Sequence, residues 1–119
     1  MKKTLVIGAS TNPARYSYLA MHKLTEKGHP VVAIGLREGE VAGVLFSSEK
    51  KAFEDIDTVT LYIGAKHQSE YYDYILSLNP KRVIFNPGTQ NSTFYDILLK
   101  NNIEAEVACT LVLLSTNNY

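Results

Sequence analysis

The first residues that could do chemistry form a polar turn near the N-terminus. It follows the apolar run Thr4–Ile7 and comprises Gly8, Ala9, Ser10, Thr11 and Asn12, with Arg15 and Ser17 a few residues later. Backbone N–H groups of such a turn, together with those at the start of the next helix, suit a phosphate group. The pattern is not G-x-G-x-x-G, so an ordinary strand-to-helix turn capped by Asn12 remains the alternative.

A second candidate site follows the apolar run Val31–Ile34. Proteins that bind NAD usually place an Asp or Glu there, which accepts hydrogen bonds from the ribose hydroxyls. This chain has Gly35, Leu36 and Arg37 instead, and a guanidinium can bind a phosphorylated ribose through two parallel hydrogen bonds. The sequence therefore disfavours NAD and favours NADP or coenzyme A (CoA). The alternative is a solvated Arg37 beside two glutamates.

Nothing in the sequence assembles into a catalytic set. The three histidines, His22, His29 and His67, lack metal-ligand spacing, and no Ser-His-Asp order or Walker A pattern occurs. We expect His22 and His29 to face solvent and His67 to lie nearer the site, with capping or plain exposure as its ordinary role. Cys109 precedes a short helix, where a thiolate could be favoured, but an unpaired cysteine commonly packs as a small hydrophobe.

Apolar runs alternate with helical segments along the chain. We predict strands at 4–7, 31–34, 58–63, 82–85 and 104–107, and helices at about 13–27, 67–78, 92–100 and 110–115. In the first helix, Asn12 is the expected N-cap and Pro13 the first helical residue, and Gly28 ends it. Its expected buried face is Tyr16, Leu19, Ala20 and Leu24. Further on, Val44–Phe46 could add a short strand, Ser48 could begin one helical turn, and Ser92 could cap the third helix.

This alternation predicts the α/β class, with a parallel sheet buried on both faces by helices. Right-handed crossovers favour a Rossmann-like, doubly wound sheet of five strands, for which we expect the order 3-2-1-4-5. Ligands of such sheets bind beyond the carboxyl ends of the strands, where the strand order reverses. That rule brings the Gly8 turn, Gly35–Arg37, Ile63–Ala65 and Asn86–Gly88 to one crevice.

Length and charge limit the class of protein. The 119 residues predict one domain over 1–119, and 12 basic residues balance 12 acidic ones. A net charge of zero disfavours nucleic-acid binding, and no apolar run approaches the ~18 residues of a membrane span. One cysteine and an N-terminal apolar run too short for a signal peptide predict a cytoplasmic protein.

The motifs together resemble a known family. Val6–Ser10, Asn12–Pro13, Arg15–Tyr18, Gly28–Val32 and the loop Gly35–Gly43 are similar to the stand-alone CoA-binding domain proteins, which resemble the N-terminal domain of the succinyl-CoA synthetase alpha subunit. The resemblance covers almost the whole chain and is most specific from Gly8 to Tyr18. It implies a Rossmann-like fold and CoA or acyl-CoA as the ligand. The synthetases use a phosphohistidine carried on a further domain, so the resemblance implies that this chain binds its ligand without catalysing a reaction alone.

The resemblance also implies which residues contact the ligand. The pyrophosphate and pantetheine path would be lined by Gly8, Ala9, Ser10, Asn12, Arg15 and Ser17. Arg37 would meet the phosphate-bearing ADP end, and Ile63 with Gly64 would cover the adenine or pantetheine side.

Two other functions remain open. One is a small NADP-dependent oxidoreductase that uses the same Arg37, although the second and third glycines of its fingerprint are missing. The other is an interaction module with a vestigial crevice. Tyr71, Tyr72 and Tyr74 cannot all face inward from one helix, so we expect Tyr71 in the core and the other two exposed, where a homo-oligomer contact could use them.

Overall fold

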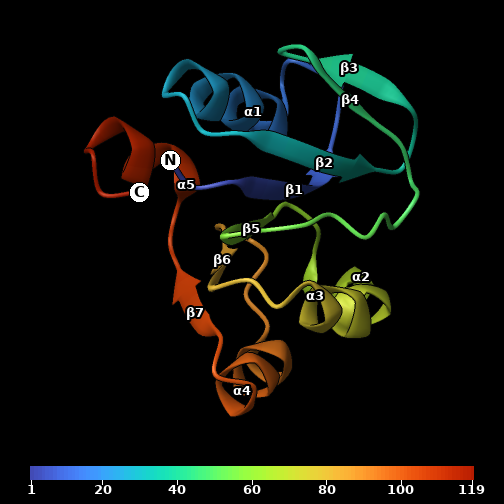
Figure 1. Cartoon of the computed structure of the whole chain (residues 1–119), viewed down its shortest axis with the longest axis vertical. Coiled ribbons are helices and arrows are strands. Elements are labelled where there is room, and N and C mark those ends of the chain that lie inside the picture. The colour runs from blue at the N-terminus through green and yellow to red at the C-terminus, as the bar shows by residue number, and fades with distance from the viewer.

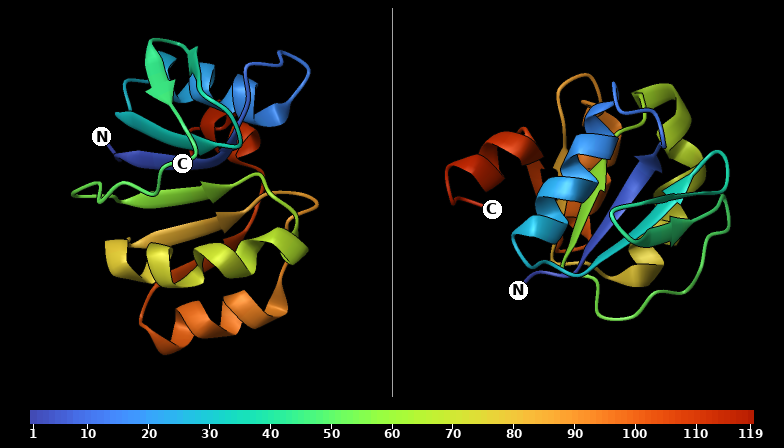
Figure 2. Two further views of the ribbon diagram at one scale, coloured as in Figure 1. Left: turned by 90° about the vertical axis from the view of Figure 1, so that its right-hand side faces the viewer. Right: turned by 90° about the horizontal axis from the view of Figure 1, so that it is seen from above.

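A five-stranded parallel sheet forms the centre of the molecule in the computed structural model, which describes all 119 residues (Figure 1). Its strands are, in spatial order, β2 (Val31–Gly35), β1 (Thr4–Ala9), β5 (Thr58–Leu61), β6 (Arg82–Phe85) and β7 (Glu104–Val107). Figure 2 shows helices on both faces of this sheet. The expected Rossmann-like α/β architecture is therefore confirmed.

Each face of the sheet carries its own layer of helices. One face is covered by α1 (Tyr16–Glu26) and α5 (Thr110–Ser115), and the other by α2 (Ala65–Gln68), a 3-10 turn (Ser69–Tyr71), α3 (Tyr72–Leu78) and α4 (Ser92–Lys100). Side chains alternate along β1, so that Leu5 and Ile7 pack toward α3 and α4 while Val6 packs toward α1. The sheet is consequently buried on both sides, as near-continuous apolar strands predict.

The strand order differs from the expected one. With the five strands numbered along the chain, the order is 2-1-3-4-5 rather than 3-2-1-4-5, because β5 pairs with β1 and not beyond β2. The hairpin of β3 (Gly39–Val41) and β4 (Val44–Phe46) supplies the reason. Its exit lies along the outer edge of β2, where the Gly35 amide donates to the Ser47 carbonyl oxygen at 3.0 Å. The edge expected for the third strand is thus occupied, and the strand order reverses between β1 and β5.

The first helix begins later than expected. The Ala14 amide donates to Asn12 Oδ1 at 2.9 Å and the Arg15 amide donates to the Asn12 carbonyl oxygen at 3.0 Å, so Asn12 caps a separate turn and α1 starts at Tyr16. The buried face of α1 also differs from the expected one and consists of Ser17, Ala20, Met21 and Leu24. Tyr16 is 70% exposed and Leu19 is 43% exposed, against the expected burial of both.

Other boundaries follow the sequence more closely. β6, β7, α4 and α5 have the expected limits, the short strand at 44–46 is present, and Gly28 ends the first helical segment with φ +84°. Ser48 begins no helix, and the N-cap of α4 is Asn91, whose Oδ1 accepts from the Phe94 amide at 3.1 Å. The helix expected at 67–78 is instead divided by the 3-10 turn.

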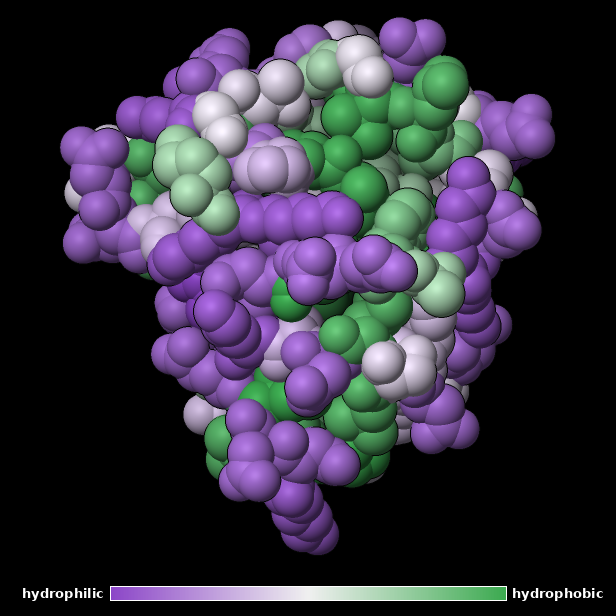
Figure 3. All heavy atoms as spheres, in the orientation of Figure 1, coloured by the Kyte–Doolittle hydropathy of each residue, from purple (hydrophilic) through white to green (hydrophobic).

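The face of the molecule shown in Figure 3 is mostly hydrophilic, with hydrophobic residues gathered over the β3–β4 hairpin at the upper right. Leu45 on β4 is 77% exposed. None of the helices combines the length and apolar character needed to span a membrane.

Candidate functional site

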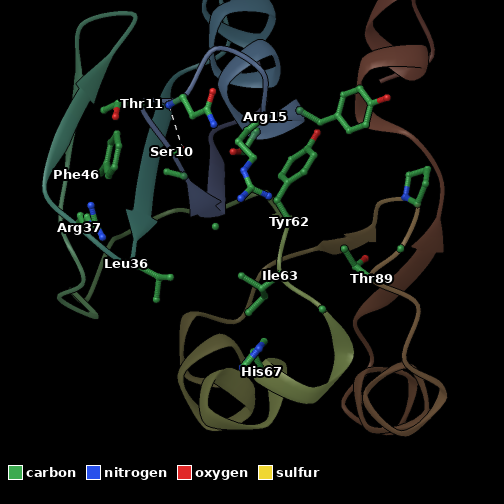
Figure 4. Close-up of a pocket in the computed structure, with 18 of the residues that line it drawn as sticks. Ser10, Thr11, Arg15, Leu36, Arg37, Phe46, Tyr62, Ile63, His67 and Thr89 are labelled. Atoms are coloured by element: carbon green, nitrogen blue, oxygen red, sulfur yellow. Dashed lines mark hydrogen bonds between the residues drawn. The ribbon is translucent and has the colours of Figure 1, made fainter.

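A pocket of about 730 Å³ opens at the carboxyl ends of β1, β2, β5 and β6 (Figure 4). Its volume lies within the ~300–1,000 Å³ typical of small-molecule sites. Ten of the eleven residues that the sequence predicts for the site line it: Gly8, Ala9, Ser10, Asn12, Arg15, Ser17, Leu36, Arg37, Ile63 and Gly64. The pocket spans the point between β1 and β5 where the strand order reverses, as doubly wound sheets lead one to expect.

Two glycines bring the first two strands and the loop after β5 close together. Gly8 lies at a bulge of β1 with φ +100°, and a Cβ there would be 2.8 Å from the Tyr62 carbonyl oxygen. A Cβ on Gly35 would be 2.5 Å from the Ala9 carbonyl oxygen. Gly35 is buried and does not line the pocket, so its expected place in the site is wrong. The absence of a side chain at Gly35 permits the close packing of β1 and β2 behind the pocket.

The turn between β1 and α1 presents free backbone donors. The Asn12 amide donates to Ser10 Oγ at 3.1 Å, and two hydrogen bonds to Asn12 complete the turn. The amides of Ser10 and Thr11 have no partner within the chain, and neither have those of Tyr16, Ser17 and Tyr18 at the start of α1. Arg15 occupies the N-cap position of α1, but its side chain accepts no hydrogen bond from the helix amides. The positive end of this 11-residue helix is therefore open to an anion.

Two arginines border the pocket without a carboxylate partner. Arg15 and Arg37 are both exposed, and neither belongs to any of the three ion pairs of the chain. Figure 4 shows Arg15 over the middle of the pocket and Arg37 near Phe46 at its margin. Glu38 also lines the pocket but forms no ion pair with Arg37. Both guanidinium groups are therefore free to bind an anionic ligand.

A buried hydrogen-bond network supports one wall of the pocket, which is formed by the loops that follow β5 and β6. Asn86 donates through Nδ2 to Thr60 Oγ1 at 2.7 Å and to the Leu61 carbonyl oxygen at 2.9 Å. Its Oδ1 accepts from the Thr110 amide at 2.9 Å, and the Thr60 and Thr110 hydroxyls lie 2.8 Å apart. This network joins β5, β6 and the start of α5 directly behind the pocket.

Tyr62 forms part of the same wall, and its hydroxyl is buried without a hydrogen-bond partner of good geometry. Burial raises the pKa of Tyr62 to about 12, although the nearby Thr110 and Thr60 hydroxyls oppose part of this rise. The phenol is consequently neutral at physiological pH.

Gln68 ties the two loops of this wall together. It is fully buried, and its Nε2 donates to the carbonyl oxygens of Ile63 at 3.0 Å and Thr89 at 2.7 Å. Its Oε1 accepts from Asn91 Nδ2 at 3.0 Å. The loop after β5 and the loop after β6 are therefore held at a fixed separation by one side chain.

Some lining residues were not predicted from the sequence: Tyr16, Glu38, Phe46, Tyr62 and Thr89. Tyr16 was assigned to the buried face of α1, but Met21 is buried and Tyr16 is exposed. Phe46 depends on the hairpin, whose packing no local pattern reveals. Tyr62 was expected inside a strand running to residue 63, whereas β5 ends at Leu61 and leaves Tyr62 at the edge of the pocket.

The remaining candidates have other places. His67 is exposed and lines the pocket, whereas Cys109 is half-buried as the N-cap of α5 and does not line it. His22 and His29 are half-buried rather than solvent-facing. The ring centroids of His22 and Tyr18 are 4.7 Å apart, and His29 Nδ1 accepts a hydrogen bond from the Lys2 amide at 3.0 Å. No cluster of His, Cys, Asp or Glu could hold a metal ion.

Tyr72 and Tyr74 are half-buried, against the expected exposure. Tyr72 stacks on Phe94 with ring centroids 4.3 Å apart and accepts from Asn91 Nδ2 at 2.8 Å, and the Tyr74 hydroxyl donates to the Lys51 carbonyl oxygen. Tyr71 is buried as expected. The tyrosines thus have contacts within the chain.

The chain is similar to several solved structures. An uncharacterized protein of known crystal structure is 49% identical, with a TM-score of 0.97 over 100% of this chain and 98% of that chain. A conserved hypothetical protein from Pyrococcus furiosus is 22% identical, with a TM-score of 0.78 over 89% and 92% of the two chains. A hypothetical protein from Pyrococcus horikoshii is 24% identical, with a TM-score of 0.85 over 97% and 82%. The last two show the fold alone.

The family is shown by a direct match. No curated protein matches the chain. The model of the family described as CoA binding domain matches residues 2–115, which is nearly the whole chain. The chain therefore belongs to the CoA binding domain family.

Proposed function

We propose that residues 1–119 act as one domain that binds CoA or an acyl-CoA in this pocket and catalyses no reaction alone. The observation that carries the proposal is the convergence of two unpaired guanidinium groups and an open helix N-terminus on one pocket. CoA carries phosphate groups at two separate places, the pyrophosphate and the ribose phosphate. Two separate cationic groups therefore suit a ligand of this kind better than they suit a ligand with a single phosphate group.

In this proposal the pyrophosphate lies on the turn between β1 and α1. Backbone amides from Ser10 onward and the Arg15 guanidinium would neutralise it, as anions are bound at helix N-termini generally. Gly8, Ala9, Asn12 and Ser17 would shape this part of the pocket.

The two ends of the ligand would diverge from that turn. The ADP end would extend past Leu36 so that Arg37 binds the ribose phosphate, and the pantetheine would extend along Ile63 and Gly64. Arg37 is exposed, so its contribution is expected to fall as salt is added.

Two measurements test this proposal. Mass spectrometry of small molecules released from freshly purified protein is expected to detect CoA or an acyl-CoA. Isothermal titration calorimetry is expected to show binding of CoA that Arg15→Gln weakens, while Lys66→Gln, an exposed position beside the pocket lining, leaves it unchanged. Tighter binding of NADPH than of CoA would refute the proposal and favour the oxidoreductase. Failure of every nucleotide to bind would favour an interaction module, and light scattering would then establish its oligomeric state.

A further inference from the structure

The loop that carries Arg37 has a glycine at each end, and both glycines pack against the same aromatic ring. Residues 35–39, here called the Arg37 loop, run from the end of β2 to the start of β3 and bring Arg37 and its two neighbours to the pocket. A Cβ on Gly35 would lie 3.0 Å from Cδ2 and Cε2 of Phe46, and a Cβ on Gly39 would lie 2.8 Å from Cζ of the same ring. Phe46 is buried and pairs with Gly39 in the β3–β4 ladder. The Arg37 loop therefore rests on one buried ring at both of its ends.

Gly39 also lies against the turn between β1 and α1. A Cβ on Gly39 would be 2.6 Å from Cγ2 of Thr11, whose backbone amide is one of the free donors of that turn. Figure 4 shows Thr11, Phe46 and Arg37 one after another along the same margin of the pocket. The φ angle of Gly39 is not positive, so space alone, and not backbone conformation, requires a glycine here. Gly39 thus lies where the Arg37 loop meets the turn that would hold the pyrophosphate.

From these contacts we infer that Gly39 is a positioning residue, which sets the separation between the two phosphate-binding parts of the pocket. The inference rests on the proposed function. Carbon atoms in ordinary contact are ~3.5–4.0 Å apart, so a side chain at Gly39 would displace the Arg37 loop or Thr11 by about 1 Å. Phe46 has little room to yield, because Gly35 packs against the same ring. Hydrogen bonds weaken steeply with such a displacement, so a ligand with phosphates at both places would lose affinity, and a ligand bound only at the turn would lose little.

The ratio of the affinities for CoA and dephospho-CoA tests this role, because only CoA has the ribose phosphate. In calorimetric titrations we expect Gly39→Ala to reduce a wild-type preference of about tenfold for CoA to about twofold or less, with the affinity for dephospho-CoA within about twofold of the wild-type value. A general loss of stability would instead weaken both ligands alike. Gly43→Ala is the matched control in the same hairpin, since it strains a residue at φ +80° but its Cβ would meet no atom within 4 Å. This control is expected to keep the wild-type preference.

A second substitution identifies the contact responsible. Thr11→Ser removes the Cγ2 methyl group and keeps the hydroxyl, so adding it to Gly39→Ala is expected to restore part of the preference for CoA. If Gly39→Ala does not fold, Phe46→Leu decides the question, because it shortens the side chain beneath the Arg37 loop and should also lower the preference.

Three results would overturn the inference. They are an unchanged preference in a folded Gly39→Ala or in Phe46→Leu, an equal loss of preference in Gly43→Ala, and equal binding of the two ligands by the wild type. Failure of the wild type to bind CoA at all would instead refute the proposed function, so the two failures are distinguishable.

Discussion

Removal of the Arg37 guanidinium tests how the pocket would recognise a ribose phosphate. Arg37 lines the pocket, is exposed and has no carboxylate partner, so Arg37→Ala breaks no ion pair within the chain. Hydrogen bonds to charged groups contribute about 1.5–3 kcal/mol, and solvent screening at an exposed position favours the lower end of that range. We therefore expect a loss of about 1.5 kcal/mol, or about tenfold in affinity for CoA.

A second ligand completes the experiment. Dephospho-CoA lacks the ribose phosphate, so wild-type protein should bind it about tenfold more weakly than CoA, and Arg37→Ala should bind both ligands equally. Calorimetry at fixed ionic strength measures this directly. Melting temperatures give an independent check, because a ligand at 100 times its Kd adds about 2.7 kcal/mol of stability. Equal affinities in the wild type, or a preference for CoA that survives in Arg37→Ala, would refute the role assigned to Arg37.

Three further predictions concern the scaffold, the first two of them at the pocket. Gly8→Ala should lower the free energy of unfolding by about 2 kcal/mol or more, because the new Cβ would strain a residue at φ +100° and contact the Tyr62 carbonyl. Gly64→Ala should change the free energy of unfolding by less than ~0.5 kcal/mol, and urea denaturation would measure both variants. Gln68→Leu should cost about 2–3 kcal/mol and weaken CoA binding, since two buried carbonyl oxygens lose their donor; unchanged binding in a folded variant would contradict the tie between the two loops. Burial, assisted by the positive charges of the N-terminus and Lys2, lowers the pKa of His29 below 6.5. The unfolded chain therefore takes up the proton first, and the free energy of unfolding should fall as pH drops below 6.5. His29→Gln should flatten this part of the pH profile in denaturant titrations.

The sheet could be predicted from sequence except for the position of one strand. The apolar runs and their spacing mark the five strands of the sheet, and both β6 and β7 have the expected limits. Strand order depends on which edge of β2 is free, and that is decided by contacts distant in sequence. The β3–β4 hairpin reaches the edge through Ser47, a residue with no distinguishing pattern around it. Local periodicity contains no information on such pairing.

Most residues that line the pocket could be predicted from the sequence, because their positions depend on where the strands end and not on the strand order. The rule that ligands lie beyond the carboxyl ends of parallel strands needs only the strand ends, and these were recognisable. It therefore brought Arg15, Arg37 and Ile63 to one pocket even though the expected strand order was wrong. The residues it missed depend on angular detail: α1 packs on the sheet through Ser17 and Met21 rather than through Tyr16, which leaves Tyr16 at the pocket.

The pocket combines a wall held by hydrogen bonds with exposed arginines, and this exposure limits how much affinity the arginines can contribute. The turn at Asn12, the Asn86 network and the Gln68 tie are all held by hydrogen bonds within the chain, so a ligand would not have to order them. Arg15 and Arg37 are exposed and unpaired, and a ligand must immobilise each at a cost of about 0.5–1.5 kcal/mol. Each guanidinium should therefore contribute about tenfold to affinity, near the lower end of the range for a hydrogen bond to a charged group. If so, the affinity for CoA should fall steeply with ionic strength in the wild type and less steeply in Arg37→Ala.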